Sequence, residues 1–433
     1  MAFVSAIART TRRLLLPATP ARLRLWTGLV SCAAVALLAA SGLLTARVQE
    51  QVRVIGGAAA PQAATAADLY FALSDLDAQV ARMVLAGDAA ELSGSQLDAL
   101  GAYQQRGREA DEDLQRSLTT ATSDADRALV LELTHELTGY RRWVWQTLTA
   151  QAQAQAPPQP PGRLPPDALG YYTQATNVLH LRLLPAAGRL RDAGETRLDR
   201  AYAAKRATVA WAVGLTVLSG GALVLLLVFL QGWLARRFRR VLNPALALAT
   251  VLALGLTAGV CLVLVAQEQR LGAARDDSLR PYLALSQARA LSYDAAADTS
   301  RYLLSGNLAL YRQDFTGKSE RVAAVLDGSG AALERWRGYE RAHQRVVALA
   351  GAGRTGAAVD LVTGIRRGDA AFDFSYYDAA VGADAGARKA GFDAALRDGE
   401  RVLAGWPLVP LPVVGVVLLL VALGVRKRLA EYR

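Results

Sequence analysis

The sequence predicts an all-α membrane protein with four transmembrane helices and two extracytoplasmic four-helix bundles, arranged as a duplicated span–bundle–span unit. Four long runs carry only uncharged, mostly apolar residues, which is the composition of membrane-spanning helices. The two long segments between them repeat apolar residues every three or four positions, the period of a bundle helix. Neither segment shows the sustained alternation of apolar and polar residues that indicates a β-strand.

The four apolar runs are each long enough to cross a bilayer, which takes about 20 residues of helix. They cover residues 25–46, 207–230, 245–266 and 405–425, and none contains Asp, Glu, Lys, Arg or His. A basic stretch precedes the first run, as in a secretory signal peptide. Because the apolar part of a signal peptide spans only about 7–15 residues, we predict that the first run is a retained anchor.

The basic residues predict which side of the membrane each segment faces. Residues 1–24, 231–244 and 426–433 together hold thirteen basic residues and one acidic residue, although the whole chain carries a net charge of only +11. Positive charge in short segments beside the spans marks the cytoplasmic side. We therefore place both termini and the short link inside the cell, and residues 47–206 and 267–404 outside the plasma membrane. This location of the excess charge also argues against nucleic acid as a partner.

Turn residues separate four predicted helices in the first exterior segment. The first helix follows a break at Gly56–Gly57 and Pro61, and a proline-rich loop covers residues 156–166. The four helices are predicted over residues 62–87, 95–121, 124–154 and 167–206. The last of them continues into the second span, and the second exterior segment, also long enough for four helices, emerges from the third span in the same way.

Three prolines, Pro407, Pro410 and Pro412, interrupt the outer end of the fourth run. Proline lacks a backbone donor and kinks a helix. The pattern predicts either a bent junction or a simple helix start at the membrane interface, and both interpretations stay open.

Short motifs recur in the same order in the two halves of the chain. The pattern Asp-x6-Arg-xx-Leu-x-Gly begins at Asp75 and again at Asp294. Three further pairs follow it in order: Gly139–Tyr140 with Gly338–Tyr339, Tyr171–Tyr172 with Tyr376–Tyr377, and Gly194–Glu195 with Gly399–Glu400. This shared order predicts that a span–bundle–span unit has been duplicated.

A polar strip within the first helix of each exterior segment is a candidate site. It comprises Asp75, Gln79 and Arg82 in the first half and Asp294, Asp298 and Arg301 in the second. Residues three and four apart share one helix face. The strip is interpreted either as a ligand or partner site or as a solvated face with an intrahelical ion pair, and the solvated face is the simpler prediction.

Two further groups of residues have both a structural and a functional interpretation. The tyrosines either line a pocket or partner surface or pack in the core; they are Tyr171, Tyr172, Tyr376 and Tyr377. The arginines of the short link set the topology and anchor lipid headgroups, and they are also candidates for docking an acidic surface of a cytoplasmic protein. They are Arg236, Arg237, Arg239 and Arg240.

The sequence lacks the motifs of an enzyme. The histidines His135, His180 and His343 are scattered without a second ligand at metal spacing, so no metal site and no catalytic residue is predicted. Residues 351–356 match a dinucleotide pattern, but no strand precedes them, so no cofactor is predicted. The spans also lack the ionisable residues that mark a transport path. These observations argue against an enzyme and against an autonomous transporter.

The architecture of four spans, two helical exterior bundles and almost no cytoplasmic mass resembles that of the actinobacterial GlnX membrane proteins. The patterns Tyr171–Glu195 and Tyr376–Glu400 are similar to those of the four-helix-bundle sensor domains of bacterial chemoreceptors. The resemblance implies a signal relay in the cell membrane. An extracytoplasmic lipoprotein that binds aspartate, glutamate or glutamine would engage the exterior, and a cytoplasmic serine/threonine kinase of the protein kinase G type would respond inside.

Two other classes of function stay open from the sequence. The bundles could sense a small molecule directly, as chemoreceptors do, or the chain could be a structural scaffold or a transporter accessory. The expected partners are the lipid bilayer, the solute-binding lipoprotein, the kinase and, as a homodimer, a second copy of the chain.

Overall fold

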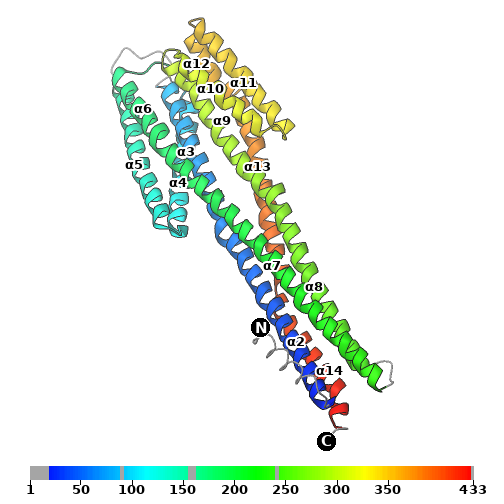
Figure 1. Ribbon diagram of the computed structural model, residues 1–433. Helices are drawn as coiled ribbons and strands as arrows, with labels where there is room; N and C mark the ends of the chain where they lie inside the picture. The colour runs from blue at the N-terminus through cyan, green and yellow to red at the C-terminus, as the bar shows by residue number, and fades with distance from the viewer. Residues whose placement is uncertain (1–18, 88–91, 155–161, 239–242, 431–433) are drawn as a thin grey trace, which may run out of the picture. The chain divides into compact units, whose positions relative to one another are not determined.

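The computed structural model describes residues 19–87, 92–154, 162–238 and 243–430, which form helices joined by short turns, with no strand among them (Figure 1). The first half holds α2 (Thr19–Val54), η1 (Ile55–Ala59), α3 (Ala60–Ala86), α4 (Ser93–Thr120), α5 (Asp124–Gln153), α6 (Pro166–Val178), η3 (Leu179–Leu183) and α7 (Leu184–Phe238). The second half holds α8 (Pro244–Ala274), η4 (Arg275–Leu279), α9 (Arg280–Leu304), α10 (Ala309–Val325), α11 (Gly330–Gly351), α12 (Thr355–Thr363), α13 (Ala370–Leu403), η5 (Trp406–Leu408) and α14 (Pro410–Ala430). The all-α prediction is confirmed.

Four helical stretches are long and apolar enough to cross a membrane, and each contains one of the predicted runs. They are Arg24–Ala86, Pro166–Arg236, Pro244–Leu304 and Ala370–Arg426, with mean hydropathies of 2.1 to 2.8 in their most apolar stretches. The four predicted spans are therefore confirmed in number and place by length and composition, as expected for a multi-pass membrane protein.

The chain divides into two compact units. The span unit comprises residues 1–54, 201–272 and 395–433, and the bundle unit comprises residues 55–200 and 273–394. The two exterior segments, each of which is predicted to form its own bundle, thus pack together in one unit. The reason is that α3 of the first segment and α9 of the second lie against each other.

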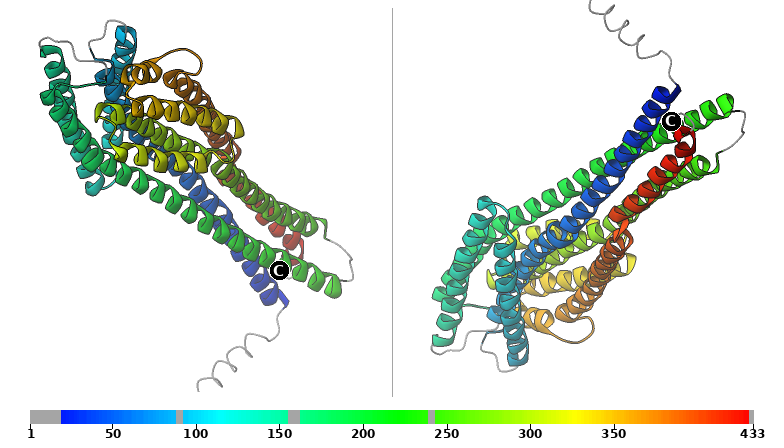
Figure 2. Two further views of the ribbon diagram at one scale, coloured as in Figure 1. Left: turned by 90° about the horizontal axis from the view of Figure 1, so that it is seen from above. Right: turned by 90° about the horizontal axis from the view of Figure 1, so that it is seen from below.

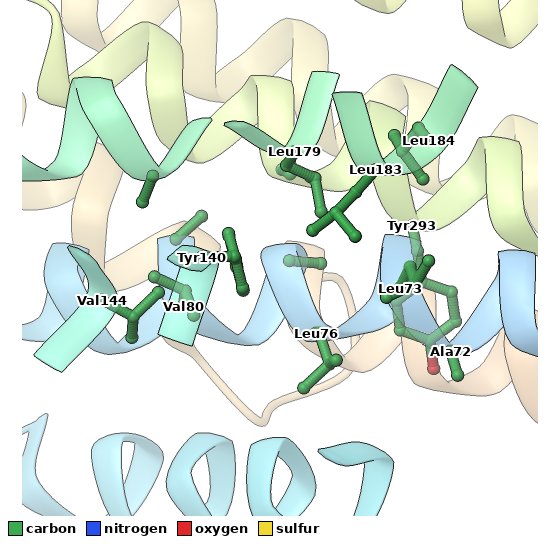
Figure 3. Close-up of a cluster of buried hydrophobic side chains, with 14 of the residues drawn as sticks. Ala72, Leu73, Leu76, Val80, Tyr140, Val144, Leu179, Leu183, Leu184 and Tyr293 are labelled. Atoms are coloured by element: carbon green, nitrogen blue, oxygen red, sulfur yellow. The ribbon is translucent and has the colours of Figure 1, made fainter. Parts of the chain in front are cut away.

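Helix α3 is the centre of the bundle unit. All of its residues 71–81 are buried, which is the burial of a helix covered on every side. Figure 3 shows side chains of several helical segments meeting on α3, among them Tyr140 of α5, Leu183 of η3 and Tyr293 of α9. The polar residues of this stretch of α3 are therefore buried together with its apolar ones.

The predicted break at Gly56–Gly57 and Pro61 does not occur, because helical structure is continuous from α2 to α3. A π turn, η1, precedes Pro61 by two residues, and a second π turn, η4, precedes Pro281 by two residues in the second half. Proline lacks a backbone donor and its ring clashes with the carbonyl four residues back. The wider π turn accommodates that clash without ending the helix. The occurrence of a π turn two residues before a proline in both halves supports the predicted duplication.

Small residues allow close approach of helices in the span unit. A side chain at Gly220 of α7 would overlap Thr257 of α8, so these two helices meet at a glycine. Helices α2 and α14 also lie side by side (Figure 2). The Asn243 side chain donates to the Gly424 carbonyl at 3.1 Å, which ties the start of α8 to α14.

The helix before the fourth span ends at Leu403 and restarts with η5 and α14. Between them Gly405 has a φ of 84°, a left-handed conformation that favours glycine. Helix α14 then begins at Pro410, and proline is favoured in the first turn of a helix. The helix-start interpretation of the three prolines agrees with this arrangement.

Candidate functional site

A cluster of buried charges joins α3 to α9 inside the bundle unit. Arg301 of α9 is only 2% exposed, and its guanidinium pairs with Asp77 of α3, which lies 224 residues away in the sequence. Its Nη1 atom also donates to Asp298 at 2.5 Å and to Asp294 at 3.3 Å. A buried cation is costly unless it is paired and hydrogen-bonded, and these three carboxylates supply that compensation.

Lys318 of α10 is the second cation of the cluster. Its Nζ atom lies 2.8 Å from Asp294 and 2.6 Å from Asp298. Two cations thus face three carboxylates, which leaves one negative charge in excess. Burial raises the pKa of Asp298, which favours uptake of the balancing proton by this carboxyl.

Three side chains of the cluster also have the spacing of a metal site. The ligand atoms of Asp77, His180 and Asp294 lie within 4.8 Å of one another. However, Asp77 and Asp294 are already paired with Arg301 and Lys318, respectively. Burial lowers the pKa of His180, which favours its neutral form. All three carboxylates of the cluster are already paired with its own cations, and we interpret it as an ion-pair network between helices.

The polar strip of α3 has a different environment. Asp75 pairs with Arg106 of α4 at 2.5 Å and accepts a hydrogen bond from the Gln79 amide at 2.6 Å. Arg82 donates to Gln79 Oε1 at 3.3 Å, but it pairs with no carboxylate among the described residues. Its Nε atom is buried without a hydrogen-bond partner in the same part of the chain. An unsatisfied buried donor costs about 1–3 kcal/mol, so Arg82 lacks an acceptor that would be favourable there.

A cavity of about 190 Å³ lies beside Arg82. Its polar lining consists of Gln79, Arg82, Ser300, Ser375 and Asp378. Its aromatic walls are Tyr293, Tyr339 and Phe374, and small side chains such as Ala78 and Ala296 complete it. These residues come from α3, α9, α11 and α13. The cavity is smaller than the ~300–1,000 Å³ pockets of drug-sized ligands, so it suits a molecule of about amino-acid size.

The two charged residues of the cavity differ in their pairing. Asp378 receives two hydrogen bonds from the Arg289 guanidinium, at 2.8 Å and 3.0 Å. The same guanidinium lies over the ring of Phe71, 4.2 Å from its centre. Arg82 has no such counter-charge among the described residues. Among the described residues the cavity therefore carries a positive charge without a counter-charge, which favours an anion.

The structure does not support the solvated-face interpretation of the two strips. The exposed fractions are 2% for Asp75, 5% for Gln79, 1% for Asp298 and 2% for Arg301. The physical reason is that α3 and α9 pack against each other and against their neighbours, so the strips face other helices. Gln79 and Arg82 line the cavity, whereas Asp294, Asp298 and Arg301 belong to the ion-pair network.

The other predicted residues divide between core, surface and link. Tyr172 and Tyr377 are buried at 5% and 0% exposure, whereas Tyr171 and Tyr376 are 36% and 52% exposed. The second tyrosine of each pair therefore packs in the core, and the first faces outward. Arg236 is exposed near the end of α7, and Arg237 is the next residue of that helix. Arg239 and Arg240 lie outside the described residues.

A buried histidine near the cavity gives the protein an expected pH dependence. His343 stacks on Phe315 with ring centres 3.5 Å apart, and its Nδ1 lies 2.9 Å from Thr299 Oγ1. Burial lowers the pKa of His343 to about 4, from an ordinary value of 6.5. The unfolded chain therefore binds this proton at higher pH than the folded chain does.

The His343 contribution to stability should be fully present above pH 6.5 and lost as the pH falls through 4, with a total of roughly 3 kcal/mol. We expect His343→Gln to flatten the fall of the melting temperature between pH 7 and pH 4, measured by scanning fluorimetry of the full chain in micelles. The exposed His135 provides the control His135→Gln, which should leave the profile as steep as in the wild type. An equally steep profile in both variants would contradict the assignment.

Comparison with known proteins bears on the first half of the bundle unit. Residues 51–203 match the family model of the actinobacterial sensor domain, a stretch that begins near the end of α2 and ends within α7. No curated protein and no solved structure matches the chain. The match supports a sensor-type actinobacterial protein with a role in sensing and signalling.

Proposed function

We propose that the protein is a transmembrane signal relay, in which the bundle unit lies outside the cell, receives an amino-acid signal and passes it through the spans. The observation that carries the proposal is the continuity of the helices. Helical structure is unbroken over residues 19–86, 166–238 and 244–304, and each stretch belongs partly to the bundle unit and partly to the span unit. A rigid helix transmits a shift or rotation along its length, whereas a flexible linker would absorb it.

The π turns are the proposed points at which the helices change register. The turn η1 begins at Ile55, the first residue of the bundle unit, and η4 begins at Arg275, two residues after that unit resumes at Ala273. A π turn holds one residue more than an α turn, and such turns are frequent at functional sites. Two arrangements of the turn would give the helix two registers, and a ligand could favour one by binding it more tightly.

The proposed partners follow from the lengths of the segments that we predict to lie on each side of the membrane. The segments that we predict to lie inside are short and rich in arginine, and we propose that the output acts on a separate cytoplasmic protein, a serine/threonine kinase of the protein kinase G type. Arg236, exposed near the end of α7, is one described residue that could meet an acidic surface in this way. On the outer side we propose a solute-binding lipoprotein loaded with aspartate, glutamate or glutamine.

A disulfide-rate experiment tests the relay. The Gln231 side chain of α7 donates to Thr250 of α8 at 2.8 Å, so these two positions face each other, and the oxidation rate of a cysteine pair there reports on how closely α7 and α8 approach. The pair is placed in the full chain with Cys32 and Cys261 replaced by alanine, in membrane vesicles of known orientation. We expect the oxidation rate to change several-fold when the purified, amino-acid-loaded lipoprotein of the same genome is added to the outer face. An unchanged rate despite docking of the lipoprotein would contradict the relay.

A further inference from the structure

The two halves of the chain place equivalent arginines in different surroundings. The shared motif equates Arg82 with Arg301, Asp77 with Ala296, and Gln79 with Asp298. Arg301 pairs with Asp77 on the facing helix and with Asp298 on its own helix. At Arg82 the corresponding positions hold Ala296 and Gln79, neither of which carries a charge.

An open volume lies where the missing carboxylate would be. Ala296 and Arg82 both line the cavity of about 190 Å³, just as Asp77 and Arg301 meet in the equivalent place of the ion-pair network. The Nε atoms of both Arg82 and Arg301 are buried without an acceptor among the described residues, so the difference between the two arginines is that only Arg301 has carboxylate partners there. Beside Arg301 the protein thus supplies a carboxylate itself. Beside Arg82 the described residues leave an open space and no counter-charge for the guanidinium.

We propose that this cavity binds a small organic carboxylate, whose oxygens pair with Arg82 in the position that the Asp77 side chain takes beside Arg301. Arginine recognises a carboxylate through two parallel hydrogen bonds. Gln79 and Ser300, exposed at 5% and 1%, are buried polar neighbours for the same group. The inference rests on the proposed sensing function and names the class of molecule that is sensed directly.

The walls of the cavity define the rest of the ligand. Tyr293, Tyr339 and Phe374 present aromatic surface, and the Asp378 carboxylate is already occupied by Arg289. These contacts favour a monocarboxylate with an apolar or aromatic body over a dicarboxylate. Since the lining comes from α3 as well as from α9 and α13, the ligand would bind both halves at once. Helices α3 and α9 directly follow the π turns η1 and η4, so occupancy of the cavity would act directly on the relay.

Thermal stability of the full chain in lipid nanodiscs tests the site. The probes are benzoate and L-phenylalanine at millimolar concentration, and the uncharged controls are benzamide and L-phenylalaninamide. A ligand that binds only the folded state raises the melting temperature, by a few degrees at concentrations well above its dissociation constant. We expect a rise with at least one carboxylate and none with its amide.

Two variants and a control locate the effect. Arg82→Gln removes the charge and should abolish the rise, and Ala296→Asp should abolish it by supplying the carboxylate from the protein. The exposed Arg108 provides the matched control Arg108→Gln, which should respond as the wild type does. Ala296→Asp should also raise the melting temperature without any probe, because it reproduces the pairing of Asp77 with Arg301.

The possible outcomes distinguish a failure of the carboxylate site from a failure of the proposed relay. No rise with either carboxylate, or a rise that persists in both Arg82→Gln and Ala296→Asp, would overturn the site. If the Gln231–Thr250 cross-linking rate still responded to the loaded lipoprotein in that case, the relay would stand without a direct ligand. A rise that depends on Arg82, together with a changed cross-linking rate on adding the same probe, would support both.

Discussion

Replacing Arg301 with methionine should lower the free energy of unfolding of the full chain by about 3–5 kcal/mol, the cost of breaking a buried ion pair and leaving one charge behind. Methionine has a similar length and no charge, so the loss reports on electrostatics more than on volume. Lys318 would still pair with Asp294 and Asp298, to which its Nζ lies within 2.8 Å. Asp77, which is 1% exposed, would lose its cation. We expect a large drop in the melting temperature in micelles.

A double-mutant cycle with Asp77→Asn shows whether the loss comes from the pair. The single variant Asp77→Asn leaves Arg301 with Asp298 and Asp294, so it should cost less than Arg301→Met. The double variant removes both charges and should recover most of the loss, since a buried pair replaced as a whole costs little. Arg337, which forms an exposed pair with Glu334, provides the control Arg337→Met, whose cost should be about 0–1 kcal/mol. Additive losses in the double variant would contradict the assignment.

The sequence predicted the helices of the first exterior segment where local signals were strong. Helices expected over residues 95–121 and 124–154 are found as α4 (Ser93–Thr120) and α5 (Asp124–Gln153). The start of α5 is marked by Ser123, whose side chain accepts a hydrogen bond from the Asp126 backbone amide. Capping residues and apolar periodicity act within a few residues, so they can be recognised in one sequence.

The candidate site could be predicted only in part, because its contacts join distant parts of the chain. The polar strips predicted from the sequence include Gln79, Arg82 and Arg301 but not Asp77 or Lys318. Asp77 does not belong to the motif that recurs in the two halves, and its partner Arg301 lies in the second half of the chain. No local signal marked their burial, because Asp75, Asp77 and Gln79 give this part of α3 polar side chains on more than one face.

Local sequence signals also did not predict that the helix continues through Pro61. Two glycines followed by a proline favour a break in an isolated helix. In the structure Ile55 and Ala59 of the π turn are buried, so packing holds the chain in a helical form that its local preferences oppose. Where local preference and packing disagree, the site of the conflict is a candidate for function, and this one coincides with the boundary between the two units.

Replacing Trp336 with alanine should destabilise the second half of the bundle unit by about 3–5 kcal/mol, the usual cost of removing a buried aromatic ring. Trp336 is fully buried, and its ring lies 5.0 Å from Tyr377 and 5.3 Å from Tyr339, between ring centres. Its Nε1 atom donates to Ser319 at 2.8 Å. We expect a fall in the melting temperature of the full chain that is comparable to that of Arg301→Met.

A conservative variant and an exposed control separate packing from hydrogen bonding in this effect. Trp336→Phe keeps a ring and loses only the bond to Ser319, so it should cost about 1 kcal/mol from that bond and less in packing than alanine does. Trp145 is 70% exposed, so Trp145→Ala should change the melting temperature little. Because Tyr339 packs on Trp336 and also lines the cavity, Trp336→Ala should weaken carboxylate binding as well as stability. Full stability in Trp336→Ala would show that this aromatic cluster does not hold the second half together, and the wall of the proposed site would then lack its support.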